Sequence, residues 1–426
     1  MRKGFNKSSS ARLLTVNDRD KMVSIEEALE IVLNSVIPLG YEDVPIIEAF
    51  NRVLYEDIIS DIMIPPVDDS AMDGYAVIAD DTYGASEIHP VKLQVIGEIQ
   101  AGGSSIGKQV SKGTAIRIMT GAPIPEGADS VVKFEDAEEE GGYVKMFRET
   151  DKYVNYKTAG EHIKEGDRVL SKGTRLNSAD VGILASLNYS TVKVYKQATV
   201  SIISTGDEIV DIGQETKVGH IRNSNAYALY SEVKKYNGLP SYFGIVKDTL
   251  SDMGDVFTKA LKSDVVISSG GVSTGKYDLV KEAYSDLGVD IQFERVNVKP
   301  GRPCVFGRKD NKLIFGLPGN PVPAMTSFIQ LVRPVILRLM GLAKIKKPIV
   351  NAVLEESIKS VKIHHLLRGH FTIRNNEFYV STTGNQKPSM LRSMSLANCL
   401  IVIPKNITRV EAGEKVMIQL INHEEI

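Results

Sequence analysis

From about residue 196 to about residue 342, short apolar runs of strand length alternate with segments whose apolar residues recur at helical spacing. This order constrains the fold more than any other feature, because alternating strands and helices form a parallel or mostly parallel sheet covered by helices. The predicted strands are Thr199–Ser204, Tyr242–Val246, Val265–Ser269, Gln292–Val298, Cys304–Phe306 and Lys312–Phe315. The predicted helices are Asn223–Tyr236, Leu250–Leu261, Tyr277–Leu287 and a last one from Pro321 to about Met340.

Three loops of unusual composition follow strands of this predicted sheet. Ser204–Glu208 follows the first strand, Ser268–Gly275 follows the third, and Leu317–Pro321 follows a later one. Ligands of open α/β sheets bind outside the carboxyl ends of the strands. Glycines there let a ligand lie close to the backbone, and a helix N-terminus offers free N–H groups to an anion. Each loop alone is also compatible with a tight turn or an ordinary helix start, but three loops at one edge indicate a ligand site.

Two further segments carry concentrated charge. Lys299-Pro300-Gly301-Arg302-Pro303, with Arg295 upstream, is stiffened by prolines and can present fixed cations to an oxyanion or phosphate. Asp68–Ala76 packs three carboxylates, a hydroxyl and a glycine into nine residues, a cluster that can hold Mg²⁺ when a phosphate completes the shell. The alternatives, a solvated basic turn and an acidic surface turn, stay open. Thr120–Asp129 is a comparable loop.

The remainder of the chain is predicted to be two helices and many short strands. Ser24–Glu27 has the pattern of a capping box that opens a helix ended by Pro38 and Gly40. Residues 61–154 consist of short strands between Gly- and Pro-bearing turns, and residues 155–195 mix turns with a short helix near 178–187. After Lys346-Lys347-Pro348 the chain returns to short strands, which predicts a separate small β domain.

Composition excludes several classes of protein. The length of 426 residues predicts about three domains. Because 51 basic and 53 acidic side chains nearly balance, we expect no nucleic-acid binding, and an anionic ligand needs a local basic site. Cys304 and Cys399 can form neither a disulfide framework nor a Cys-rich zinc site. No apolar run approaches bilayer-spanning length, and residues 1–21 lack the apolar core of a secretory signal, so we expect a cytoplasmic protein without membrane contact. His364-His365 is expected at the surface.

Seven segments together resemble the MoeA family, which includes the gephyrin E domain. They occur in the order of that family across about residues 20–426, and the combination of SAMDGYA with LPGNP is highly specific. The segments are Pro65–Ala76, Arg117–Asp129, Ser204–Glu208, Ile221–Asn225, Ser269–Asp278, Val298–Pro303 and Gly316–Pro321. One departure is Lys276, which stands where the family commonly has an acidic residue and changes the charge beside the Gly-Gly loop.

The resemblance implies a multidomain α/β plus β fold. Its centre would be a MogA-like three-layer α/β domain, accompanied by an inserted β domain, an elongated discontinuous domain and a C-terminal β barrel. The implied boundaries are 1–21 for a basic flexible tail, 22–60 and 155–195 for the elongated domain, 61–154 for the inserted β domain, 196–342 for the α/β molybdopterin-binding domain and 343–426 for the barrel.

The resemblance also implies a reaction, the last step of molybdenum cofactor biosynthesis. A molybdopterin molybdotransferase of this kind uses Mg²⁺ and inserts molybdate, or tungstate, into the dithiolene of adenylylated molybdopterin, with release of AMP. Family members are homodimers whose cleft joins the α/β domain of one subunit to the β domain of the other. Transient contacts with the molybdopterin adenylyltransferase and with apo-molybdoenzymes are also expected.

Matching positions imply which residues do this work. The substrate carries phosphates, a dithiolene and an incoming dianion, so it needs carboxylates that hold a metal, fixed cations and backbone donors together. The implied catalytic residues are Asp73, Thr120, Glu208, Asp248 and Asp278, of which Asp73, Glu208 and Asp278 are the candidate Mg²⁺ ligands. The implied substrate- and anion-binding residues are Ser269, Gly270, Gly271, Ser273, Arg295, Lys299, Arg302, Pro318, Gly319 and Pro321.

Two other functions are compatible with parts of this pattern. An enzyme that adenylylates molybdopterin has the same α/β type, but this chain also carries the domain of Asp73 and a C-terminal β domain. A non-catalytic cofactor-binding scaffold is the second alternative, because gephyrin also clusters receptors. No groove for a partner peptide can be read from the sequence.

Overall fold

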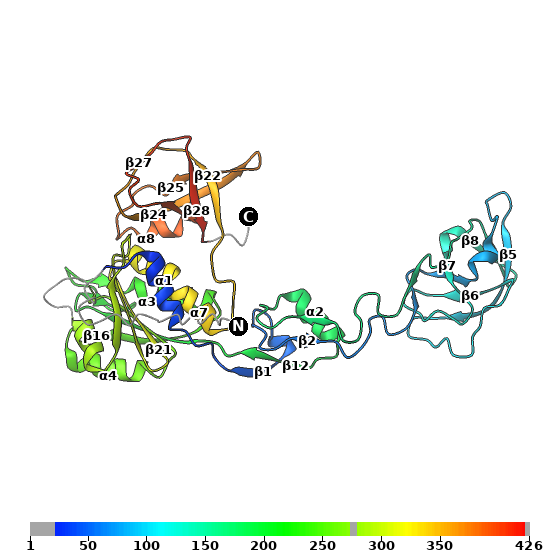
Figure 1. Ribbon diagram of the computed structural model, residues 1–426, viewed down its shortest axis with the longest axis horizontal. Coiled ribbons are helices and arrows are strands. Elements are labelled where there is room, and N and C mark those ends of the chain that lie inside the picture. The colour runs from blue at the N-terminus through cyan, green and yellow to red at the C-terminus, as the bar shows by residue number, and fades with distance from the viewer. Residues whose placement is uncertain (1–21, 273–278, 422–426) are drawn as a thin grey trace, which may run out of the picture. The chain divides into compact units, whose positions relative to one another are not determined.

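A computed structural model describes residues 22–272 and 279–421 (Figure 1). Contacts between Cα atoms divide the chain into two compact units. The larger consists of Met1–Tyr55, Gly173–Leu176 and Val192–Ile426, and the smaller of Glu56–Lys172 and Asn177–Thr191. The finer domain boundaries given above remain predictions, and the tail expected at residues 1–21 lies outside the described residues.

The smaller unit is built on a six-stranded sheet with strand order β7-β4-β6-β5-β9-β8. All pairings are antiparallel except that of β5 with β6. Alternate residues of a strand point to opposite faces, so Tyr75 and Ala76 belong to different apolar clusters. The short strands predicted here are confirmed. They are β4 (Gly74–Val77), β5 (Val91–Ile99), β6 (Thr114–Ile118), β7 (Ser130–Lys133), β8 (Ala137–Glu140) and β9 (Tyr143–Met146).

Short elements make up the rest of the smaller unit. β2 (Ile58–Ile59) pairs with β11 (Arg168–Leu170), and β3 (Asp69–Ser70) pairs with β10 (Tyr156–Lys157). The helix predicted near residues 178–187 is confirmed as α2 (Ser178–Ser186), which Asn177 caps from its N-terminus. In the larger unit, β1 (Tyr41–Pro45) pairs with β12 (Thr191–Tyr195). Single turns of 3₁₀ helix occur at η2 (Ile46–Glu48), η3 (Ala79–Thr82) and η4 (Phe134–Asp136).

The larger unit contains the α/β domain, whose six-stranded sheet has the order β16-β13-β17-β21-β20-β18. The first four strands are parallel, which confirms a mostly parallel sheet, whereas β20 is antiparallel to both of its neighbours. β20 runs the other way because a tight turn at Asp310 joins it directly to β21, and such a turn connects only antiparallel strands. The strands are β13 (Thr199–Thr205), β16 (Leu239–Val246), β17 (Val265–Ser269), β18 (Asp290–Arg295), β20 (Pro303–Lys309) and β21 (Lys312–Leu317).

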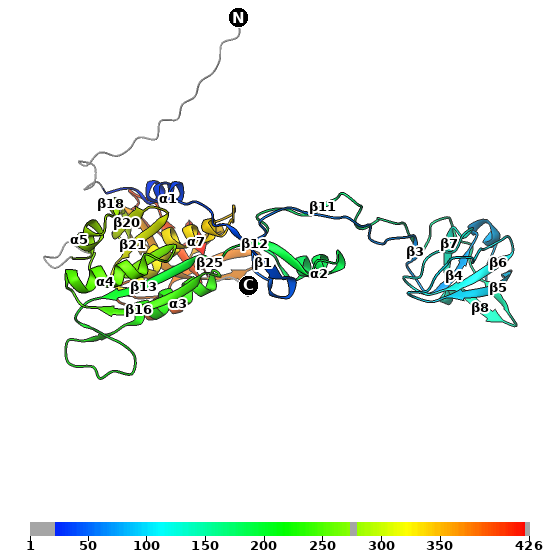
Figure 2. The same ribbon diagram turned by 90° about the horizontal axis from the view of Figure 1, so that it is seen from below.

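Helices cover both faces of this sheet (Figure 2). In β13, Val200 and Ile202 pack on the side of α3, whereas Ile203 packs on the side of α4 and α5. The three-layer architecture is therefore confirmed. One layer holds α1 (Ile25–Asn34), α3 (Ser224–Lys235), α6 (Pro321–Ser327), the π-helical turn η5 (Phe328–Val332) and α7 (Arg333–Leu339), and the other holds α4 (Leu250–Ala260) and α5 (Leu279–Asp286).

The predicted first helix begins where its capping box places it. The Ser24 backbone N–H donates to Glu27 Oε2 at 2.8 Å, and the Glu27 backbone N–H donates to Ser24 Oγ at 3.1 Å. Ala28 and Val32 of this helix, α1, are fully buried in the core of the α/β domain. The helix ends at Asn34, earlier than the Pro38 and Gly40 stop that the sequence predicted.

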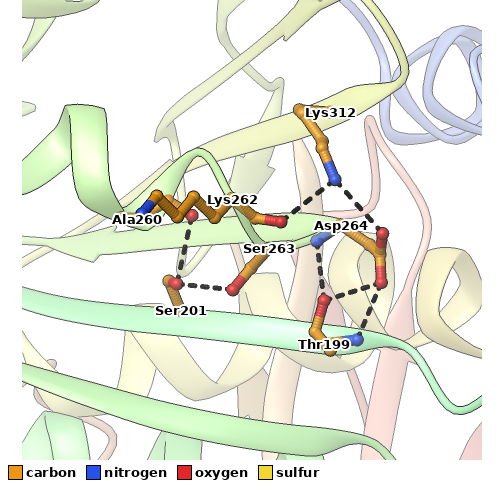
Figure 3. Close-up of polar contacts among 7 residues, drawn as sticks. All are labelled: Thr199, Ser201, Ala260, Lys262, Ser263, Asp264 and Lys312. Atoms are coloured by element: carbon orange, nitrogen blue, oxygen red, sulfur yellow. Dashed lines mark hydrogen bonds and ion pairs between the residues drawn. The ribbon is translucent and has the colours of Figure 1, made fainter.

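A polar network fixes the amino ends of three strands (Figure 3). Asp264, just before β17, accepts hydrogen bonds from the backbone N–H of Thr199 at 3.0 Å and from its hydroxyl at 2.7 Å. Lys312, the first residue of β21, places Nζ 3.4 Å from the other Asp264 oxygen and 3.2 Å from the Lys262 carbonyl. The network joins β13, β17 and β21 at their amino ends and supports the register in which these strands pair. The positions at which the three loops begin, at the carboxyl ends of the strands, are thereby fixed relative to one another.

A closed five-stranded barrel follows the α/β domain (Figure 1). The sheet order β24-β25-β22-β28-β26 closes because β26 pairs again with β24, and β19 (Val298–Lys299) adds to β24 from the α/β domain. The predicted C-terminal barrel is confirmed. Its elements are β22 (Ile349–Leu354), β24 (His364–Arg374), β25 (Glu377–Thr382), α8 (Leu391–Ser395), β26 (Cys399–Ile403) and β28 (Lys415–Leu420). β23 (Ile358–Lys359) pairs with β27 (Arg409–Val410) beside it.

One helical stretch corrects an expectation from the sequence. Pro321–Leu339 is, by length and composition alone, apolar enough to cross a membrane, although no run of that length was expected. Within its apolar window, 83% is buried inside the protein. Burial of this kind is typical of the central helix of a folded core, and the helix packs on the sheet as described above.

Candidate functional site

The loops that follow β13, β17 and β21 surround a cavity of about 390 Å³ at the carboxyl edge of the sheet. The three loops therefore meet as the topology predicted. We call this the acidic cavity, because the side chains of Glu208 and Asp248 line it. Its other lining residues are Thr205, Gly206, Ile209, Ile221, Gly270, Gly271, Val272, Pro303, Pro318, Gly319 and Asn320.

Close packing, in addition to ligand access, explains the glycines of the loop after β17. A Cβ on Gly270 would lie 2.3 Å from the carbonyl oxygen of Thr205, and the φ of +106° is one that other residues rarely adopt. A Cβ on Gly271 would lie 2.6 Å from Val280. The backbone of this loop thus lies directly against the end of β13, which leaves both glycines in the cavity wall.

Asp207 adds a third negative charge beside the two carboxylates that line this cavity. The backbone N–H of Asp248 lies 3.4 Å from Asp207 Oδ1. Burial raises the pKa of Asp248, and the charges of Asp207 and Glu208 raise it further. Asp248 Oδ1 is buried and has no hydrogen-bond partner among the described residues. A cation or a hydrogen-bond donor from a ligand would satisfy this oxygen.

The Mg²⁺ implied by the family fits these residues as part of a shell. Within residues 22–272 and 279–421, no group of three His, Cys, Asp or Glu side chains is arranged to hold a metal by itself. Mg²⁺ is usually held by one or two carboxylates together with waters and substrate phosphates. Glu208 and Asp248 can supply the carboxylates. Of the other predicted ligands, Asp73 belongs to the smaller unit. Asp278, like the predicted binding residue Ser273, lies outside the described residues.

Asn225, at the start of α3, joins two of the loops. Its side-chain Nδ2 donates to Ser269 Oγ at 2.8 Å and to the Gly319 carbonyl oxygen at 2.8 Å. The Ser269 hydroxyl lies 3.4 Å from the carbonyl oxygen of Pro318. Ser269 is therefore occupied in holding the loops together. Asn225 occurs in a segment that the resemblance matched, but its bridging contacts were not predicted.

Asp211 anchors the loop that carries Glu208. Its two carboxylate oxygens accept hydrogen bonds from Tyr227 at 2.7 Å and from Tyr242 at 2.9 Å. The hydrogen bond from Tyr227 is the largest influence that lowers the pKa of Asp211. Because the two tyrosines belong to α3 and β16, this carboxylate ties the loop to a helix and a strand of the sheet.

A second cavity, of about 690 Å³, lies where the α/β domain meets the barrel. We call it the basic cavity, because its described lining contains five basic side chains and no aspartate or glutamate. The basic residues are Lys299, Arg302, His365, Arg368 and Lys387. Positive charge without carboxylates is the environment that an oxyanion requires.

The proline-flanked turn contributes two of these cations. Lys299 belongs to β19, whose parallel pairing with β24 places it in register with His365. Gly301 has φ +109°, and a Cβ there would lie 2.7 Å from Ser327 Oγ, so the turn packs tightly against α6. Arg302 is exposed at the cavity, with Nε 3.2 Å from Met22 Sδ. Arg295, also predicted to bind anions, ends β18 and is not among the described residues that line either cavity.

Arg368, like Lys387, is a basic residue of this cavity that the sequence did not single out. It is 1% exposed, and Nε donates to Ser393 Oγ at 2.9 Å while one terminal nitrogen lies 3.2 Å from the carbonyl oxygens of Asn385 and Lys387. Burial lowers its pKa to about 10. No described carboxylate pairs with it. Because a buried guanidinium without an anion is costly, its position at the cavity wall favours a bound anion.

His365 corrects the expectation that the His364-His365 pair lies on the surface. It is 6% exposed, because β24 is covered on one edge by β19 and on the other by β26. Its Nδ1 lies 3.0 Å from Ser360 Oγ. No local pattern predicts this burial, since it depends on strand pairing between two domains.

The two cavities adjoin at one loop. Pro303, Pro318 and Asn320 line both of them, and Gly319 lines the acidic cavity. Pro321 is the first residue of α6, where proline is favoured, and it does not belong to the described lining of either cavity. A ligand with chemically different ends can therefore reach both cavities across the Pro318–Asn320 loop.

Asp73 and Thr120 form a separate pair in the smaller unit. The backbone N–H and the hydroxyl of Thr120 both donate to Asp73 Oδ1, each at 2.7 Å. These bonds, the backbone one first, hold the pKa of Asp73 below its usual value. Both residues are exposed. The pair is thus a fixed, ionised carboxylate at the surface of its unit.

Three stretches of the chain match known protein families. Residues 23–188 match the MoeA N-terminal region (domain I and II), residues 201–338 match a probable molybdopterin binding domain, and residues 351–421 match the MoeA C-terminal region (domain IV). The α/β domain therefore belongs to the class of probable molybdopterin binding domains, here flanked by the two other MoeA regions.

Individual relatives cover nearly the whole chain. The molybdopterin molybdenumtransferase of Haemophilus influenzae is 35% identical over 408 residues, which are 94% of this chain and 99% of that protein. The one from Staphylococcus epidermidis is 33% identical over 393 residues, 92% of this chain and 94% of that protein. A crystal structure of the molybdopterin biosynthesis moeA protein from Pyrococcus horikoshii is 31% identical, with a TM-score of 0.81 over 94% of this chain and 100% of that one. The chain belongs to the MoeA family and is a transferase.

Proposed function

We propose that this transferase catalyses the last step of molybdenum cofactor biosynthesis. It would insert molybdate, or tungstate, into the dithiolene of adenylylated molybdopterin and release AMP. The observation that carries the proposal is the junction of an acidic and a basic cavity at the Pro318–Asn320 loop. Its relatives, named molybdopterin molybdenumtransferase, support it.

The acidic cavity would bind the pyrophosphate of the adenylylated pterin. Mg²⁺, when bound there, would neutralise phosphate charge and favour cleavage of the phosphoanhydride. Glu208 and Asp248 would hold the cation, and their mutual repulsion would fall as it binds. The backbone N–H of Gly271 would face the phosphates, whereas the N–H of Gly270 donates to the Leu317 carbonyl oxygen at 3.1 Å.

The basic cavity would bind the oxyanion. Lys299, Arg302 and Arg368 provide positive charge from the turn and from the barrel, and Arg368 is already held in place by Ser393. A compact dianion offers little apolar area, so fixed cations must supply most of its affinity. From there the dianion would reach a dithiolene held beside the Pro318–Asn320 loop.

Several properties of the proposed enzyme come from the resemblance alone. The active species would be a cytoplasmic homodimer in which Asp73 and Thr120 also act on the substrate. It would contact the molybdopterin adenylyltransferase and apo-molybdoenzymes transiently. Arg295, Ser273 and Asp278 keep their predicted roles in substrate or metal binding.

Incubation of the purified protein with adenylylated molybdopterin, Mg²⁺ and either oxyanion tests the proposal, with AMP release and active cofactor as readouts. We expect both products to form together and to depend on Mg²⁺. Release of pyrophosphate from ATP and molybdopterin would instead identify the adenylylating alternative. Tight pterin binding without any turnover would identify a scaffold.

A further inference from the structure

We propose that His365 is a proton-carrying ligand of the oxyanion, neutral in the empty basic cavity and protonated from solvent when a dianion binds there. The inference rests on the proposed oxyanion function of this cavity. It adds that binding consumes a proton and therefore depends on pH. No other histidine lines either cavity among the described residues.

Strand pairing places His365 beside the cations of the turn. Lys299 and His365 are register partners in adjacent parallel strands, and such partners project their side chains from the same face of a sheet. Both line the basic cavity, together with Arg368 three residues further along β24. His365 is almost completely buried, so a ligand in the cavity would replace most of its contact with water.

Burial and the neighbouring basic groups disfavour a charged imidazole at His365 in the absence of an anion. Burial first, and then the charges of Lys299, Arg368 and His364, together lower the pKa of His365 to about 4. Arg302 and Lys387 add further basic groups to the same cavity, and β26, on the other edge of β24, places the apolar Ile403 opposite His365. Glu26 Oε1 lies 4.0 Å from Nδ1 of the neighbouring His364.

A bound dianion reverses this balance. Two negative charges in the cavity offset the neighbouring cations and favour the imidazolium, so the pKa of His365 rises on binding. Between the low pKa of the free protein and the higher pKa of the complex, each anion bound takes up one proton. Linkage then requires affinity to fall as pH rises through that interval, by up to roughly tenfold per pH unit.

The contacts of His365 suit an imidazolium. A protonated imidazole has two N–H donors, whereas the neutral ring has one. Ser360 Oγ, 3.0 Å from Nδ1, can accept the first donor. Nε2–H then remains for an oxygen of the anion. Imidazole is the side chain whose charge ordinarily changes near neutral pH, so the charge of His365 can follow the occupancy of the cavity.

Calorimetric titration with molybdate tests the inference directly. Each titration is run at one pH in buffers of different ionisation enthalpy, and the slope of the heat against that enthalpy gives the protons taken up per anion. We expect an uptake approaching one proton near pH 6 and decreasing toward about pH 8. His365→Gln should abolish the uptake, weaken binding severalfold near pH 6 and flatten its pH dependence. The matched control is His370→Gln, because His370 is exposed on the same strand.

Three outcomes are distinguishable. Proton uptake that disappears in His365→Gln and persists in His370→Gln supports the inference. Molybdate binding that is weakened by Lys299→Ala but takes up no proton, or takes it up equally in His365→Gln, overturns the role of His365 and leaves the oxyanion cavity intact. Absence of molybdate binding, or binding that neither Lys299→Ala nor Arg368→Gln affects, overturns the proposed function of the cavity and this inference with it.

Discussion

The side-chain amide of Asn225 holds Ser269 in place, with Nδ2 2.8 Å from Oγ, and the same nitrogen lies 2.8 Å from the Gly319 carbonyl oxygen. One residue at the start of α3 thereby fixes the relative position of two loops that form the acidic cavity. The Gly319 side of this bridge continues into the Pro318–Asn320 loop, at which the two cavities adjoin.

Removal of this bridge should impair turnover more than folding. Asn225→Ala loses two hydrogen bonds, each worth about 1 kcal/mol, and frees the loops to move relative to each other. We expect kcat for AMP release to fall roughly tenfold or more, because small displacements of reacting groups are costly. Asn225→Asp keeps the size but loses the donor and should behave similarly. Asn311→Ala, at an exposed turn between β20 and β21, is the control. Unchanged kcat in both Asn225 variants would show that the bridge does not position the site.

The charge of Glu208 should be required for AMP release. Glu208→Gln keeps the shape of the side chain and removes the negative charge that a cation would need. We expect AMP release to be abolished while the circular dichroism spectrum and thermal unfolding stay normal. Asp73→Asn should act in the same way if its ionised carboxylate contacts the substrate complex. Glu215→Gln, exposed in the same loop as Glu208, serves as the control. Near-normal release by both Glu208→Gln and Asp73→Asn would make these carboxylates structural.

Asp264 should contribute to stability and not to catalysis. Its carboxylate accepts two hydrogen bonds from Thr199 and faces Lys312, at the edge of the sheet opposite the acidic cavity (Figure 3). Hydrogen bonds to a charged group are worth about 1.5–3 kcal/mol, so we expect Asp264→Ala to lower the free energy of unfolding by about 2–3 kcal/mol in urea denaturation. Asp255→Ala, exposed on α4, should change it little. A large loss of kcat in still-folded Asp264→Ala would contradict this separation of roles.

The active species should be a dimer. The predicted catalytic residues are divided between the two units, with Asp73 and Thr120 in the smaller and Glu208 and Asp248 in the larger, and the resemblance places such units together across subunits. Sedimentation at micromolar concentration should therefore give twice the mass of the chain. A fully active monomer would contradict the prediction. Recovery of activity on mixing Asp73→Asn with Glu208→Gln protein would support shared sites.

The sequence predicted the α/β core well, because its buried strands depend on local composition. β17 was predicted with both boundaries, since Val265–Ser269 is a short run buried on both faces and followed by two glycines. β16 begins at Leu239, before the predicted start at Tyr242. Pro240 fits inside this strand because β16 is an edge strand, where a proline need not donate to a neighbour.

The site was predictable where it follows from topology and not where it depends on distant pairing. The three loops at the carboxyl edge could be placed together because parallel strands end on the same side. Arg368 and His365 reach the basic cavity only because β19 pairs with β24, which begins far along the chain in another domain. No local pattern in β24 distinguishes them from ordinary strand residues, and nothing in the sequence shows that Asn225 bridges two loops.

We propose above all that the basic cavity binds the oxyanion and the acidic cavity binds the pyrophosphate. Variants of the Lys299–Pro303 turn test this most directly. The measurement is the molybdate dependence of cofactor formation for Lys299→Ala and Arg302→Ala, beside equilibrium binding of adenylylated molybdopterin, with exposed Lys362→Ala as control. Each turn cation should contribute about 1–2 kcal/mol, because both side chains are exposed and partly screened. The molybdate concentration needed for half-maximal rate should therefore rise roughly tenfold, while nucleotide binding changes little. Wild-type molybdate dependence combined with lost nucleotide binding would contradict the claim and show that the turn serves the pyrophosphate.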